Sequence, residues 1–342
     1  MDTLRLTKDK LNDFLKSISD VQLMAPIVKN GRTSFEIIEN PDAVELNLDD
    51  YTATIKKAAF PQNETLFAYC SGKNGSEIKD VQEMPKTVVF GIRPCDAKAF
   101  VILDSLFKGD YEDPYYLKRR EATVLIGHSC SEPTNRCFCP SVGGSPAGQE
   151  GLDLLFTDIS DSAYAVEVLT DQGKAIIDSA GDVLTKADEA DKVKCDEAAK
   201  AALNKIRRSV NLENIHELLP SAFNSDVWKE IGNKCIGCGI CTYNCPTCHC
   251  FDIQDEGCSA AGRRLRVWDG CMYPEFTVHA SGENPRKDRG DRIRNRMLHK
   301  FSFYPQNLGY IACVGCGRCI ELCPVNEDLI EILNKVREAV NE

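Results

Sequence analysis

The sequence predicts an α+β protein in which a mixed α/β domain, residues 1–225, precedes an α-helical domain, residues 226–342. In the first part, short runs rich in β-branched residues alternate with helical patterns, whereas residues 225–231 and 328–340 of the chain show helical periodicity. The cysteines are also unevenly distributed, because residues 1–225 hold six of the 18 and residues 226–342 hold twelve. This change in composition places the domain boundary near residue 225.

The first part contains four apolar runs that we interpret as strands, at residues 87–92, 123–126, 152–159 and 163–169. Residues 96–107, between the first two runs, have the apolar spacing of a helix, and residues 114–120 favour a second, shorter helix. Residues 22–38 favour a hairpin that turns at Asn30-Gly31. Residues 186–209 are rich in Ala, Lys, Glu and Asp and predict a solvated helix that leads toward the second part, which we expect to be helical with short loops.

Composition and charge exclude several classes of protein. No apolar run approaches the roughly 20 residues that span a bilayer, and the first residues lack the basic and apolar regions of a secretory signal. Without export, disulfides are not expected, so we interpret the cysteines as thiols or metal ligands of a cytoplasmic protein. The net charge of −11 argues against nucleic acid as the main partner. No phosphate-binding loop or G-x-G-x-x-G fingerprint occurs, although flavin sites often lack short motifs.

Two copies of C-x2-C-x2-C-x3-C-P give the strongest signal, as CIGCGICTYNCP at residues 235–246 and CVGCGRCIELCP at residues 313–324. In bacterial two-cluster ferredoxins the fourth cysteine of each such run binds the other cluster. The spacing therefore predicts one [4Fe–4S] cluster on Cys235, Cys238, Cys241 and Cys323, and a second on Cys313, Cys316, Cys319 and Cys245. Zinc is the alternative, but zinc sites usually pair two C-x2-C knuckles. The 66 residues between the motifs predict an α-helical ferredoxin-type domain.

Four further cysteines follow two of the predicted strands. Cys95 comes after residues 87–92, and the other three come after residues 123–126. If these strands are parallel neighbours, both loops lie at the same edge of the sheet, where four thiolates suffice for one [4Fe–4S] cluster. We therefore expect a third cluster on Cys95, Cys130, Cys137 and Cys139. Zinc and unligated thiols are the alternatives at this site.

The other polar and cysteine residues near these motifs carry weaker expectations. His128 could replace one cysteine ligand, but we expect it to be a hydrogen-bonding neighbour. Arg93 and Arg136 either offset the charge of a cluster or are solvated loop residues. We expect Cys248, Cys250, Cys258 and Cys271 to be packing residues beside the clusters rather than extra ligands, Cys70 to lie in the core, and Cys195 to be an isolated thiol.

A basic segment lies between the two motifs of this acidic protein. Residues 263–300 contain ten basic and five acidic residues, a net charge of +5 that leaves −16 for the rest of the chain. We expect the basic residues to stabilise reduced clusters or to bind an acidic partner, with a solvated helix face as the alternative. They are Arg263, Arg264, Arg266, Arg286, Lys287, Arg289, Arg292, Arg294, Arg296 and Lys300.

Several segments, taken in order over roughly residues 50–340, resemble one family. They are GIRPCDAKAF, DPYYLKRREATVLIGHSCSEPTNRCFC, CIGCGICTYNCPTCHCFDI, RVWDGC, NPR, HKF and CVGCGRCIELCP. They are similar to the iron–sulfur subunit family that includes sulfhydrogenase β subunits and the corresponding iron–sulfur subunits of anaerobic sulfite reductases. Similar subunits accompany flavin oxidoreductases that are linked to heterodisulfide reductases.

The resemblance implies a subunit of an anaerobic oxidoreductase complex that transfers electrons and has no catalytic site of its own. It would relay electrons between a flavin- and NAD(P)H-binding subunit and a terminal subunit of hydrogenase, sulfite reductase or heterodisulfide reductase type. It also supports a cluster on the cysteines of the first domain. Two other functions are a self-contained flavin-dependent reductase and a redox sensor, although no effector or nucleic-acid motif favours the sensor.

Overall fold

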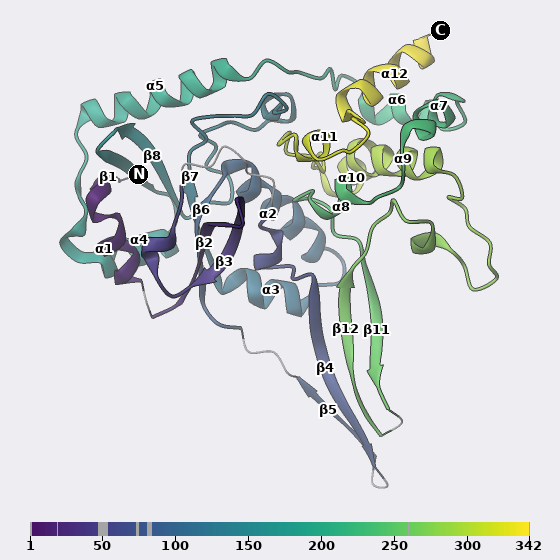
Figure 1. The fold of residues 1–342 in the computed structure, drawn as a ribbon, viewed down its shortest axis with the longest axis horizontal. Helices are drawn as coiled ribbons and strands as arrows, with labels where there is room; N and C mark the ends of the chain where they lie inside the picture. The colour runs from purple at the N-terminus through teal and green to yellow at the C-terminus, as the bar shows by residue number, and fades with distance from the viewer. Residues whose placement is uncertain are drawn as a thin grey trace.

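The computed structural model describes residues 2–18, 20–46, 54–72, 75–80, 84–258 and 260–341. These residues form an eight-stranded sheet, a four-stranded sheet and a helical region toward the C-terminus (Figure 1). The expected α+β class is therefore confirmed. No helix in these described ranges is both long and apolar enough to cross a membrane.

The eight-stranded sheet has the strand order β10-β1-β9-β8-β7-β6-β2-β3. Its four central strands, β2, β6, β7 and β8, run parallel, and the outer strands pair antiparallel. The strand bounds are β1 Thr3–Thr7, β2 Gln22–Lys29, β3 Arg32–Ile38, β6 Thr87–Ile92, β7 Thr123–His128, β8 Leu154–Ser160, β9 Ala163–Val168 and β10 Thr185–Lys186. All four expected strands and the hairpin at Asn30-Gly31 are therefore confirmed, with ends that differ by up to two residues.

Alternating side chains of the central strands give the large sheet two apolar faces. Val88 and Phe90 pack with Phe14 of α1 on one face, and Val89 packs with Phe100 of α2 on the other. The helices of this part are α1 Leu11–Ser17, α2 Pro94–Phe107, α3 Pro114–Glu121, α4 Asp171–Ala180 and α5 Glu189–Lys205, with 3₁₀ turns at Lys8–Lys10, Pro41–Ala43, Lys56–Ala58, Cys139–Val142 and Gly181–Val183. The helix α5 is the expected solvated helix.

Residues 206–341 form a mainly helical region around one apolar core that includes Trp228, Met297, Phe301 and Leu333. Phe138, from a loop of the first part, is buried in the same core. The helices are α6 Ile215–Ser221, α7 Val227–Lys234, α8 Ile240–Tyr243, α9 Arg289–Leu298, α10 Tyr304–Leu308, α11 Arg318–Glu321 and α12 Leu329–Asn341, with a 3₁₀ turn at Pro274–Thr277 and a π-helical turn at His299–Phe303.

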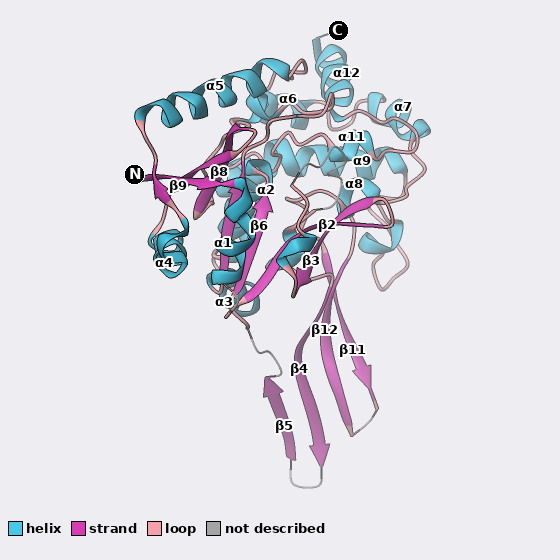
Figure 2. Ribbon diagram, turned by 60° about the vertical axis from the view of Figure 1, so that its left-hand side comes forward, coloured by secondary structure: helices cyan, strands magenta, loops and turns pink. Residues whose placement is uncertain are grey.

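The second part also contains a hairpin that the sequence did not predict, so the expectation of helices and short loops alone is wrong. Its strands, β11 Phe251–Gly257 and β12 Ala261–Trp268, join β4 Asn63–Gly72 and β5 Gly75–Asp80 in an antiparallel sheet of order β11-β12-β4-β5. We call these four strands the β arm, which projects away from the rest of the molecule (Figure 2). The β arm combines strands from both sides of residue 225.

Candidate iron–sulfur sites

Cys235, Cys238, Cys241 and Cys323, which we call set 1, line one small cavity of about 50 Å³. The first three lie on the loop after α7 and on α8, and Cys323 lies just beyond α11. The backbone can turn tightly around this cavity because Gly237 and Gly239 each have a φ of 73°. The structure thus brings together the four cysteines that the crossed spacing predicts, and Cys238 among them is exposed.

Cys313, Cys316, Cys319 and Cys245, which we call set 2, lie on the second motif loop and at the end of the first. Burial, and to a lesser extent the sulfur of Cys245, raise the pKa of Cys313 to about 12. Burial and Cys245 also raise the pKa of Cys316. Cys245 is linked to the second motif loop by Lys300, whose Nζ lies 3.3 Å from the Sγ of Cys245 and donates to the carbonyl oxygen of Ala312 at 2.8 Å. Because iron binds the thiolate, metal binding must overcome this preference for the neutral thiol and releases protons.

Cys95, Cys130, Cys137 and Cys139, which we call set 3, line a cavity of about 400 Å³. The parallel pairing of β6 and β7 brings the two loops to the same edge of the large sheet, as expected. Burial is the main cause that raises the pKa of Cys139 to about 12, and the sulfurs of Cys137 and Cys130 add to it. Four thiols, one from the first turn of α2 and three from the segment after β7, therefore converge on one site.

The donor chemistry of all three sets fits a [4Fe–4S] cluster, which four thiolates hold in ferredoxins. Among the residues that the structure describes, no three or more His, Cys, Asp or Glu side chains are grouped tightly enough to hold a single metal ion. The ligands of a cubane bind four different irons, so they are spread more widely than the ligands of one ion.

Set 2 lies between the other two sets. Cys319 of set 2 lines the cavity of set 1, and Cys316 of set 2 lines the cavity of set 3. The loops of sets 2 and 3 are in direct contact, because the backbone N–H of Phe138 donates to the carbonyl oxygen of Gly315 at 2.8 Å. Gly315 has a φ of 65°, and a Cβ there would lie 2.5 Å from the Cα of Cys139. Only glycine permits this approach.

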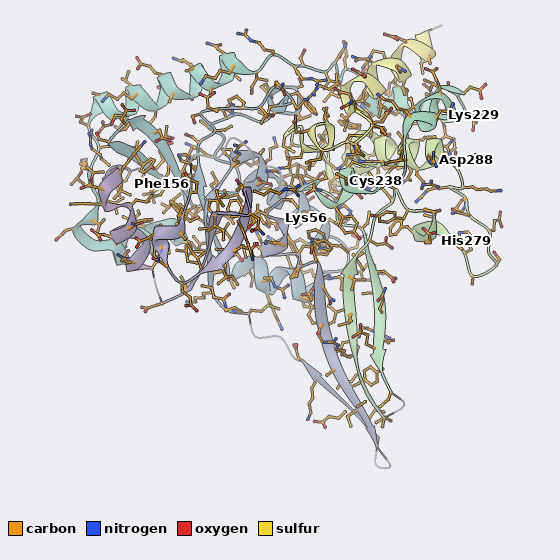
Figure 3. The ribbon with its side chains drawn as sticks, in the orientation of Figure 1. Lys56, Phe156, Lys229, Cys238, His279 and Asp288 are labelled. Carbon is orange, nitrogen blue, oxygen red and sulfur yellow. The ribbon has the colours of Figure 1, made fainter. Side chains whose placement is uncertain are left out.

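Several buried cations lie beside these sulfurs, among them Lys300, Arg296 and Lys56. The Nζ of Lys300 lies 3.3 Å from the Sγ of Cys245, and the Nη2 of Arg296 donates to the carbonyl oxygen of Cys241 at 3.3 Å. The Nζ of Lys56 donates to the carbonyl oxygens of Cys245 and Cys248 at 3.0 and 2.8 Å. Figure 3 shows Lys56 where the N-terminal and C-terminal parts meet. Burial lowers the pKa of Lys56, and the nearby sulfurs oppose that effect.

The basic segment 263–300 is therefore not a solvated helix face as a whole. Arg266, Arg292, Arg296 and Lys300 are all buried. Only part of the segment is exposed, and two of its exposed residues are paired on the β arm, Arg263 with Glu256 and Arg264 with Asp255.

The polar residues near set 3 have defined contacts. The Nε2 of His128 lies 2.7 Å from the Oδ2 of Asp158, and His128 does not line the cavity of set 3. It is therefore a hydrogen-bonding neighbour of Asp158 rather than a substitute ligand. Arg93 lines the cavity, whereas the Nε of Arg136 donates to Glu321 at 3.2 Å near the surface.

The remaining cysteines divide into three groups. Cys248 lies beside Cys245 of set 2, and Cys250 lies beside Cys271. Cys70 and Cys258 are exposed on the β arm, so the expectations of a core residue and of a packing residue beside a cluster are wrong for them. Cys195 packs on α5 against Ile159 and two alanines.

Sequence reasoning missed Lys56 and the role of Asp96. Lys56 is separated from its partners by 186 to 192 residues, so no local pattern could identify it. Asp96 is fully buried and binds Arg318 with both carboxylate oxygens, at 2.7 and 2.5 Å. In the sequence, the position of Asp96 directly after Cys95 was the only feature that pointed to a role at the site.

Comparison with known proteins places part of this chain in an iron–sulfur family. The family described as "4Fe-4S dicluster domain" matches residues 234–327, which contain sets 1 and 2. The chain is 32% identical to "Sulfhydrogenase 2 subunit beta" of Pyrococcus furiosus, over 98% of this chain and 99% of that protein. It is 21% identical to "F420-dependent formate dehydrogenase subunit beta" of Methanocaldococcus jannaschii, over 52% of this chain and 39% of that protein. The chain therefore belongs to the iron–sulfur family of sulfhydrogenase β subunits.

Proposed function

We propose that this chain is the electron-transfer subunit of a cytoplasmic anaerobic oxidoreductase complex and holds three [4Fe–4S] clusters, one on each cysteine set. The clusters would supply one-electron transfer, and the chain would supply their order, spacing and surroundings. The observation that carries this proposal is the position of set 2, whose cysteines line the cavities of both other sets. A series of three neighbouring sites is suited to a relay.

The two ends of this series reach the surface, which supports docking of a different partner at each end. At one end Cys238 of set 1 is exposed. At the other end the cavity of set 3 has Glu132, Asn135 and Glu321 at its rim, all exposed. We assign one end to a flavin- and NAD(P)H-binding subunit and the other to a terminal subunit of hydrogenase, sulfite reductase or heterodisulfide reductase type.

Copurification tests this function. A tagged chain, expressed under anaerobic conditions in its native host, is expected to copurify with a flavoprotein and a second redox subunit. In that complex Cys130→Ser should abolish NAD(P)H-driven reduction of the terminal subunit, because it removes a candidate ligand of set 3. The matched control is Cys70→Ser, on the exposed β arm, which should leave the rate unchanged. A flavin absorption band in the isolated chain would instead support a self-contained reductase.

A further inference from the structure

The ammonium group of Lys300 holds together both halves of set 2. Its Nζ contacts the Sγ of Cys245 at 3.3 Å, the Oγ1 of Thr247 at 3.0 Å and the carbonyl oxygen of Ala312 at 2.8 Å. Thr247 follows Cys245 by two residues, and Ala312 directly precedes Cys313. The lysine thus joins the one ligand from the first motif to the loop that carries the other three.

Lys300 is buried, with 3% of its surface exposed, and no carboxylate of the described residues lies within ion-pair distance of it. Taking an ammonium group out of water is costly unless an opposite charge lies close by. The neighbours that could carry that charge are sulfurs, and four thiolates around an oxidised [4Fe–4S] core leave a net charge of about −2. Lys300 is therefore placed to act on the electrostatics of set 2 directly.

The cations near the other sets are differently placed. Arg318, beside sets 2 and 3, is neutralised by the carboxylate of Asp96. Arg93 lines the cavity of set 3 but is partly exposed, so water screens its charge. Near set 1, Lys234 is half exposed and lies 3.8 Å from Glu327. The charge of Arg296 acts on two sets, because both Cys241 of set 1 and Cys319 of set 2 lie near it. Among the residues that the structure describes, a buried ammonium group contacts a candidate ligand sulfur only at set 2.

We infer that Lys300 raises the reduction potential of the cluster on set 2 above the potentials of the clusters on sets 1 and 3, so that an electron in this chain rests at the middle site. A buried positive charge lowers the free energy of an added electron, and it acts strongly because the protein interior screens it weakly. The middle site would then hold the electron between transfers, and it would pass that electron on when the neighbouring outer site has been oxidised by its partner. This inference rests on the proposed function only in assuming clusters on the cysteine sets.

The test is an anaerobic potentiometric titration of the full chain, followed by electron paramagnetic resonance. The signal of set 2 is identified as the one that Cys245→Ser changes. In the wild-type chain this signal should have the highest midpoint potential of all clusters. In Lys300→Met its equilibrium constant for reduction should fall at least tenfold, which is about 59 mV for one electron.

Two variants control this measurement. Lys300→Arg keeps the positive charge and should retain most of the wild-type potential. Lys229→Met removes an exposed lysine that lies at the edge of the molecule (Figure 3) and should leave all potentials unchanged. The inference is overturned if the set 2 signal is not the highest in the wild-type chain, a result that needs no variant to fold. It is also overturned if Lys300→Met shifts that signal no more than Lys229→Met.

Failure of the proposed function would give a different result. A chain with two clusters would show a lower iron content, and a chain with other partners would copurify with different proteins. In either case the potentials of sets 1 and 2 can still be compared, and the effect of Lys300→Met can still be measured.

Discussion

Asp96 and Arg318 form a buried bidentate ion pair that joins α2, which carries Cys95 of set 3, to α11, which carries Cys319 of set 2. Asp96 is the third residue of α2 and directly follows Cys95, and Arg318 begins α11 beside Cys319. Both side chains are at most 4% exposed. This pair, together with the backbone contact between Phe138 and Gly315, connects the large sheet to the helical region at the candidate sites.

Removing one partner of this pair should destabilise the chain strongly. Asp96→Leu leaves the guanidinium of Arg318 buried without its carboxylate, which typically costs about 3–5 kcal/mol. The double variant Asp96→Leu with Arg318→Met removes both charges and should recover much of that loss. Urea unfolding under anaerobic conditions measures both variants. Equal destabilisation of the single and double variants would contradict this account.

The fourth ligand of set 2 can be tested against its neighbour in the chain. Cys245→Ala should remove about four irons and the set 2 signal while set 1 remains, because the crossed arrangement assigns Cys245 to the distant motif. Cys248→Ala is the matched control, since Cys248 lies beside Cys245 but is not assigned to a cluster. Iron analysis distinguishes the two. Loss of iron in Cys248→Ala with none in Cys245→Ala would assign the ligand to Cys248 instead.

The β arm should depend on Arg266. Its Nε and Nη2 donate to Glu64 at 2.9 and 2.6 Å, and it also pairs with Asp113 at the start of α3. Arg266→Met removes this partner, but Arg119 still pairs with Glu64 at 2.6 Å, so the substitution should cost about 1–3 kcal/mol. Arg263→Met, which breaks the exposed pair with Glu256, should cost about 0–1 kcal/mol. Similar urea midpoints for the two variants would show that the buried pair does not anchor the arm.

Two partly buried histidines predict a loss of stability as the pH falls. Burial lowers the pKa of His249 to about 3 and of His299 to about 4, and nearby positive charge adds to the effect. Below pH 6.5 the unfolded chain binds protons at these residues and the folded chain does not, so the free energy of unfolding decreases. Between pH 7.5 and 6.0 each histidine should contribute a loss of about 0.8 kcal/mol.

The variant pair His249→Asn with His299→Asn should reduce this dependence, whereas His216→Asn, at an exposed position, should not. The measurement is the urea midpoint at both pH values, with absorbance confirming that the clusters remain bound. An unchanged dependence in the double variant would show that these histidines are not its source.

The sequence predicted features that depend on local pattern. Periodicity located the central strands and α2, and the parallel order of β6 and β7 explains why Cys95 meets the cysteines that follow β7. The β arm was missed because β12 carries the charged run Arg263, Arg264 and Arg266, which we interpreted as a basic segment rather than a strand. Its pairing with β4 joins residues about 200 positions apart, such as Arg266 and Glu64, and no local pattern encodes such a contact. Cys70 was expected in the core for the same reason, since an apolar run in a projecting sheet resembles a buried strand.

The number of irons bound per chain tests the central claim most directly. Iron and acid-labile sulfide are measured in the chain purified under anaerobic conditions. Three clusters predict about twelve irons per chain, falling to about eight in Cys137→Ser and staying at about twelve in Cys195→Ser. About eight irons in the wild-type chain, unchanged by Cys137→Ser, would contradict a cluster on set 3 and with it the three-site relay.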